Sequence, residues 1–129
     1  MARRKRIFSG AELEGRYGYA RAVAAGDRVL VSGTAPIWPD GACDPDPGVQ
    51  ARRCLEIIEA ALREAGAELG DVVRTRMFVT DAAFQEAVGA AHAKAFASHP
   101  PATSMVVVAG LLDERWKVEI EAEAIRAPR

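Results

Sequence analysis

The segment Trp116–Ile125, with the sequence WKVEIEAEAI, has the most regular pattern in the chain. Apolar and charged side chains alternate strictly, which is the two-residue period of a β-strand with one buried face. The apolar set is Trp116, Val118, Ile120, Ala122 and Ala124, and the charged set is Lys117, Glu119, Glu121 and Glu123. The segment therefore predicts a sheet with one face in the core. The other face carries three carboxylates toward water or toward a partner.

Other segments also have strand-like patterns. Residues 17–25 and 28–37 are apolar runs separated by Gly26 and Asp27, which predicts a β-hairpin. Residues 102–111, ATSMVVVAGL, predict the strand that precedes the last one. In residues 71–80 we expect one face to carry Val73, Thr75, Met77 and Val79, and the other to carry Arg74, Arg76 and Phe78.

Two segments between these strands have the helical period. The first is an amphipathic helix that ends near Gly66, with Val49, Leu55, Ile58, Leu62 and Ala65 inward and Gln50, Arg53, Glu56 and Arg63 outward. Asp81 is a candidate cap for the second helix, which His99, Pro100 and Pro101 end. The expected inward stripe of that second helix is Phe84, Val88, Ala91 and Ala95.

This order of elements predicts one α+β domain over residues 1–129. We expect a mixed sheet with two helices packed on one face, in the order β-β-β-α-β-α-β-β. Arg3, Arg4, Lys5 and Arg6 are expected to be a solvated lead-in to the first strand, with a phosphate-binding arm as the alternative.

Composition narrows the classes of function. Half of the residues are hydrophobic and the formal net charge is −1, so the chain has no global attraction for nucleic acid. No apolar run reaches the length of a membrane span, and no secretory signal follows the basic N-terminus. Cys43 and Cys54 have no metal-ligand spacing, and we expect free thiols in a cytoplasmic protein, with Cys54 in the core.

The sequence carries none of the common catalytic signatures. It has no Ser-His-Asp arrangement, no phosphate-binding loop and no GxGxxG motif. His92 lies near the inward stripe of the second helix, and His99 precedes the two prolines. Neither histidine has a second ligand at metal-binding spacing, so we expect no metal.

Several stretches together are similar to one known family. The chain resembles the reactive-intermediate deaminase family, RidA or YjgF, from about residue 17 to its C-terminus. The matching pieces are YARAV (19–23), VSGTAPI (31–37), AGAELGDVVRTRMFVTD (65–81), PATSMVVVAGL (101–111) and KVEIEAEAI (117–125). No piece is decisive alone, but their order and spacing are specific.

The resemblance implies a chorismate-mutase-like (YjgF-like) fold and a homotrimer with a small-molecule cleft between subunits. Enzymes of this family hydrolyse 2-imino or 2-enamino acids to 2-keto acids and ammonia without a metal or cofactor. An arginine binds the substrate carboxylate with its planar fork, and a glutamate holds or activates the attacking water.

The resemblance assigns roles to particular positions. Glu119 matches the glutamate that handles water, and it is the candidate catalytic residue; as a strand residue alone it is an ordinary solvated side chain. The candidate substrate-binding residues are Tyr19, Ser32, Gly33, Thr103 and Met105. Packing and strand-end roles are the alternatives for Tyr19 and Ser32.

Thr103 is the main departure from the family pattern, because it stands where family enzymes carry the arginine. A threonine offers one hydroxyl and no charge, which costs about 1–3 kcal/mol in binding an anion. Met105 stands at a position often occupied by cysteine, and Gly89 where many members have asparagine. Thr103 as an ordinary strand residue is the alternative. Arg21 or Arg76 replaces the arginine if its side chain reaches the cleft; the alternative is that both are surface or interface ion-pair residues.

Three functions follow from these residues. The first is a cofactor-free imine or enamine deaminase whose substrate is not clamped by arginine. The second is a trimeric metabolite-binding protein without turnover, which Glu119→Ala would distinguish, because a binder keeps its affinity. The third is a ribonuclease, against which the net charge and the lack of an aromatic and basic patch argue. We expect a small-molecule ligand and self-association, but no nucleic acid or membrane partner.

Overall fold

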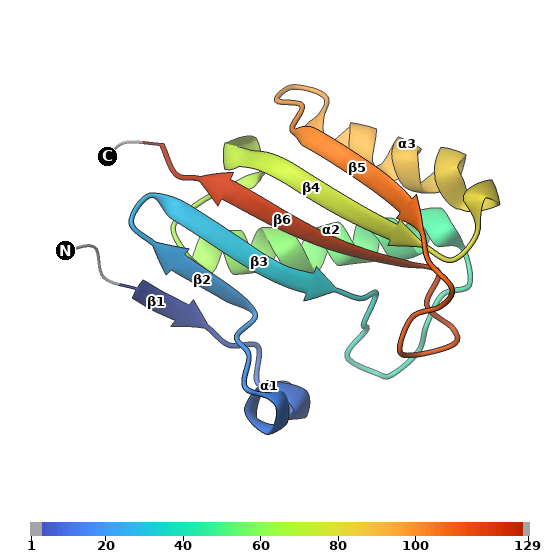
Figure 1. Cartoon of the computed structure of the whole chain (residues 1–129), viewed down its shortest axis with the longest axis horizontal. Helices are drawn as coiled ribbons and strands as arrows, with labels where there is room; N and C mark the ends of the chain where they lie inside the picture. Colours follow the sequence, from blue (N-terminus) through green and yellow to red (C-terminus); the bar gives the residue numbers. More distant parts are fainter. Residues whose placement is uncertain (1–3, 128–129) are drawn as a thin grey trace.

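The computed structural model describes residues 4–127, which form one six-stranded sheet covered on one face by two helices (Figure 1). The elements are β1 (Arg4–Ile7), α1 (Glu12–Tyr17), β2 (Ala22–Ala25), β3 (Arg28–Thr34), α2 (Pro47–Glu64), the 3₁₀ helix η1 (Leu69–Asp71), β4 (Val72–Val79), the 3₁₀ helix η2 (Ala82–Phe84), α3 (Gln85–Phe96), β5 (Ala102–Val107) and β6 (Val118–Ile125). The expected α+β architecture, with two helices on one face, is confirmed.

The strand order in the sheet is β1-β2-β3-β6-β4-β5. The predicted hairpin is formed by β2 and β3, and β6 lies between β3 and β4 as an antiparallel partner of both. Only β4 and β5 run parallel among the described strands, with α3 as their crossover. This pairing sets Thr103 opposite Thr75 and Met105 opposite Met77.

The core lies between the sheet and the helices. Ile58 and Leu62 of α2 and Ile120 of β6 are completely buried there. Asp46 caps α2 by accepting hydrogen bonds from the backbone N–H groups of Gly48 and Val49. The opposite face of the sheet, which we call the open face, has no helix over it (Figure 1).

The helix α1 was not predicted, and the strand predicted over residues 17–25 is shorter than expected. Residues Glu12–Tyr17 are helical, and Gly18 ends the helix with a φ of 76°. Glu14 is 4% exposed because its carboxylate accepts hydrogen bonds from the backbone N–H groups of Ser9 and Gly10. β2 therefore begins only at Ala22.

Two expected side-chain directions are wrong. Gln50 was expected on the outer face of its helix, but it is completely buried. Its amide donates to the carbonyl oxygens of Asp44 and Arg115, and its amide oxygen accepts from the N–H of Lys117. Val73 was expected on the same face as Thr75, Met77 and Val79, but it is 44% exposed whereas those three are buried, because the pairing of β4 with β6 shifts by one residue there.

Several smaller predictions are confirmed or refined. Cys43 and Cys54 are free thiols, and Cys54 is in the core. Asp81 caps η2, which leads directly into α3, rather than α3 itself. No helix within the described residues is long and apolar enough to cross a membrane.

Candidate functional site

The strand β3 is irregular at the position where two of the candidate binding residues lie. Its pairing with β6 shifts between Val31 and Thr34, so that Ser32 and Gly33 form a bulge. The Ser32 hydroxyl donates a hydrogen bond of 2.7 Å to the carbonyl of Ala20. Gly33 has no side chain, and a Cβ atom built there would lie 2.5 Å from Oε2 of Glu119. Glycine at this position therefore lets the carboxylate lie against the backbone.

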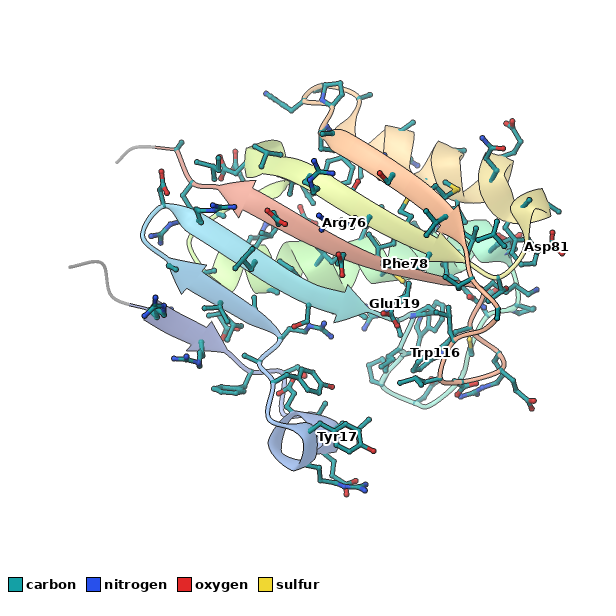
Figure 2. The ribbon with its side chains drawn as sticks, viewed as in Figure 1. Tyr17, Arg76, Phe78, Asp81, Trp116 and Glu119 are labelled. Atoms are coloured by element: carbon teal, nitrogen blue, oxygen red, sulfur yellow. The ribbon has the colours of Figure 1, made fainter. Side chains whose placement is uncertain are left out.

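Glu119 lies on the open face of the sheet, paired across β6 and β4 with Phe78 (Figure 2). It is half-buried, and within residues 4–127 its carboxylate makes no hydrogen bond or ion pair. Burial raises the pKa of the Glu119 carboxyl; nearby Arg21 opposes this shift and Glu121 adds to it. A half-buried carboxylate with a raised pKa and free oxygens suits the transfer of protons to and from water.

Arg21 lies beside this carboxylate. One of its Nη atoms donates a hydrogen bond of 2.7 Å to the carbonyl of Gly33, and its Nε is buried without a partner. Burial lowers the pKa of the Arg21 guanidinium, and Tyr19, Glu14 and Glu119 oppose that shift. The structure thus gathers Tyr19, Arg21, Ser32, Gly33 and Glu119 at one end of β3.

Thr103 and Met105 lie on the opposite face of the sheet from Glu119. Their partners in β4 are Thr75 and Met77, both of which are buried against the helices. The Thr103 hydroxyl is 2.8 Å from the Thr75 hydroxyl, and Met105 packs on the core. A single protomer therefore does not bring Thr103 and Met105 together with Glu119.

The other candidate for a substitute arginine is engaged elsewhere. Nη1 of Arg76 lies 3.0 Å from a carboxylate oxygen of Glu121 and 3.5 Å from one of Glu123, and Arg28 contacts Glu123 at 3.3 Å. These four side chains form an ion-pair ladder on the open face, where Figure 2 shows Arg76. Arg76 is an ion-pair residue, as the alternative expectation had it.

Sequence reasoning missed the partners of Thr103. Thr75 Oγ1 is 2.8 Å from Nε2 of His92, so the two threonines and the histidine form one hydrogen-bond chain. Thr75 is the polar residue in an otherwise apolar inward row of β4, a signal that could have found it. Burial lowers the pKa of His92. Within the described part of the chain, no three metal-ligating side chains are grouped to hold an ion.

Comparison with known proteins adds to this geometry. The family model described as Endoribonuclease L-PSP matches residues 10–126. The chain is 39% identical over 112 residues to the 2-iminobutanoate/2-iminopropanoate deaminase of Salmonella typhimurium, covering 84% of this chain and 87% of that protein. It is also 39% identical over 123 residues to an uncharacterized protein of Streptomyces coelicolor, covering 95% and 92%.

Solved structures share the fold. Rv2704 of Mycobacterium tuberculosis, a member of the YjgF/YER057c/UK114 family, superposes with a TM-score of 0.88 at 45% identity, covering 95% of this chain and 99% of that one. TdcF of Escherichia coli with bound serine has a TM-score of 0.79 at 34% identity, covering 84% and 88%. These likenesses confirm the YjgF-like fold that the sequence indicates.

Proposed function

The chain belongs to the RidA/YjgF family, and from this premise we propose that it hydrolyses small 2-imino or 2-enamino compounds without a cofactor. The observation that carries the proposal is the half-buried, unpaired carboxylate of Glu119 beside the Gly33 bulge. Relatives of this chain carry the name 2-iminobutanoate/2-iminopropanoate deaminase, which supports this chemistry.

The proposed reaction needs only water and one group that moves protons. Glu119 takes a proton from water while the water oxygen bonds to the imine carbon, and the C=N double bond opens as its nitrogen takes up that proton, which gives a carbinolamine. The hydroxyl of the carbinolamine then gives its proton to Glu119 as the carbonyl forms and the C–N bond breaks. The nitrogen takes up this second proton and leaves as ammonia, so that an imino acid and water become a keto acid and ammonia.

The two groups of candidate residues fit a site built from two copies of the chain. Because Thr103 and Glu119 lie on opposite faces of the sheet, a cleft that uses both takes Glu119, Ser32 and Gly33 from one subunit and Thr103 from its neighbour. The homotrimer implied by the family resemblance supplies such a contact. The exposed apolar residues Leu30 and Val106 on strands of the sheet support an assembly through this surface.

The deciding measurement is ammonia release from freshly generated 2-iminopropanoate and bulkier 2-imino acids. We expect the wild type to accelerate release above the buffer rate. We expect Thr103→Arg to lower KM for these carboxylates about tenfold or more, since a guanidinium makes a charge-assisted bidentate contact that a hydroxyl does not. The proposal is overturned if the wild type releases ammonia no faster than buffer from every imino acid while it still binds the keto acid product. That result would favour a binding protein without turnover.

Gly33→Ala tests whether the position of the Glu119 carboxylate matters. The new Cβ would overlap Oε2, the far end of a flexible side chain, so we expect the carboxylate to move while the fold stays intact. We expect kcat to fall about tenfold, because displaced catalytic groups lose their alignment. The control is Gly15→Ala, where a Cβ meets nothing within 4 Å. Equal kcat values for both variants would mean that the position of the Glu119 carboxylate over Gly33 does not matter for the reaction.

A further inference from the structure

A chain of hydrogen bonds links three elements at the edge of the sheet. Nε2 of His92 on α3 lies 2.8 Å from the Thr75 hydroxyl on β4, which lies 2.8 Å from the Thr103 hydroxyl on β5. Thr75 is completely buried, whereas Thr103 is exposed on the edge strand. The chain thus connects a half-buried imidazole, through a hydroxyl that solvent cannot reach, to a hydroxyl that a ligand can reach.

Resting on the proposed function, we propose that His92, Thr75 and Thr103 form a relay that binds the carboxylate of the substrate at the Thr103 hydroxyl, and that His92 takes up a proton when the anion binds. The relay takes the place of a direct cationic clamp. It also gives His92 the role of a positioning residue. Nε2 of His92 reaches the Thr103 hydroxyl through Thr75 and by a longer direct contact of 3.5 Å, and it does not touch the ligand.

The direction of the hydrogen bonds supports an anionic ligand. Each hydroxyl has one proton and can donate once. When Nε2 of His92 carries a proton, it donates to Thr75, and Thr75 then donates to Thr103. The proton of Thr103 is left to point to an outside acceptor, and a carboxylate has only acceptors. Without a ligand, the carbonyl of Pro101, 3.3 Å from the Thr103 hydroxyl, can accept that proton.

His92 is the titratable group of the relay. The charged groups on the elements around it are directed elsewhere. On α3, Glu86 is exposed in the first turn and Lys94 lines a groove with Glu59 of α2. Asp71 caps η1, Arg74 and Arg76 line the open face of β4, and His99 lies beyond α3 beside Gly70. β5 itself carries no charge. A bound anion at Thr103 would therefore be the nearest new charge that His92 meets.

The relay has a definite pH dependence. Burial lowers the pKa of His92 and so favours the neutral imidazole, with which the chain of hydrogen bonds can run in either direction. As the pH falls through the pKa of His92, the cation fixes Thr103 as a donor and strengthens its bond to the anion. Thermodynamic linkage requires the reverse effect as well, so a bound carboxylate must raise the pKa of His92.

The experiment titrates the full-length protein with 2-oxobutanoate, a stable keto acid, at pH 7.5 and pH 5.5. We expect the wild type to bind about threefold to tenfold more tightly at the lower pH. Thr75→Val, which keeps the shape of the buried side chain, and His92→Gln, which cannot titrate, should each have a smaller pH dependence than the wild type. The pH dependence that remains belongs to Glu119, which lies in the same proposed cleft and has a raised pKa. His99→Gln is the matched control and should keep it, since the chain has only two histidines.

Imidazole NMR gives a second readout that does not depend on activity. The pKa of His92 should rise when 2-oxobutanoate binds to the wild type and should stay constant in Thr103→Val. An unchanged pH dependence of binding in Thr75→Val, or no binding by the wild type, would overturn the relay. If 2-oxobutanoate binding shifts the pKa of His92 but no ammonia is released, the relay is supported and the deaminase proposal is wrong. If Thr75→Val releases ammonia with the KM and pH dependence of the wild type, the deaminase proposal is supported and the relay is wrong.

Discussion

Glu119→Gln is expected to lower kcat for ammonia release at least about 100-fold while leaving KM within severalfold. The amide has nearly the shape of the carboxylate and fits the same space over Gly33, but it cannot accept a proton from water. The measurement is steady-state ammonia release from 2-imino acids. Glu123→Gln is the control, because Glu123 lies on the same face of β6 but is held in ion pairs with Arg28 and Arg76.

The pH profile separates a proton-transfer role from a purely structural one. As a base, Glu119 must be ionised, so activity should rise as the pH increases through its pKa. Burial sets that pKa above the usual value of a glutamate, which moves the acidic limb of the profile upward. Glu119→Gln should remove this limb from whatever activity remains. A retained limb, or a variant with wild-type kcat and the same assembly, would contradict a catalytic role for Glu119.

Local sequence patterns were sufficient to predict a helix or strand where the segment buries one face along its whole length. The alternation in β6 and the helical period of α2 each have one apolar side that burial selects, and the turn at Gly26 and Asp27 fixes the hairpin. Such patterns do not report contacts between distant segments. Helix α1 is only six residues long and is held by the buried Glu14, so its period is too short to detect.

The candidate site shows the same limit. The family resemblance supplied Glu119, Gly33 and Thr103, but the sequence alone could not show that Thr103 and Glu119 lie on opposite faces. That follows from the register between β4 and β5, which places Thr103 opposite the buried Thr75. The hydrogen bond from Thr75 to His92 likewise joins residues that are 17 positions apart, and it depends on how α3 packs over the sheet.

Gln50→Leu is expected to destabilise the protein by about 2–5 kcal/mol, the largest loss of stability among the substitutions considered. Gln50 is completely buried on α2, and its amide satisfies the carbonyls of Asp44 and Arg115 and the N–H of Lys117. A leucine fills a similar volume but offers no hydrogen bond. It leaves those backbone groups without this partner where the loop before α2 meets the start of β6.

The control for this substitution is Gln85→Leu, because Gln85 is exposed in the first turn of α3. Both variants are compared with the wild type by denaturant unfolding at one protomer concentration, since self-association would otherwise shift the midpoint. We expect Gln85→Leu to stay within about 0.5 kcal/mol of the wild type. Equal stabilities for the two variants would mean that water replaces the Gln50 amide. The loop before α2 and the segment leading into β6, the strand that carries Glu119, would then be joined by apolar packing and by the hydrogen bonds from Lys117 to Pro45 and from Arg115 to Gly41.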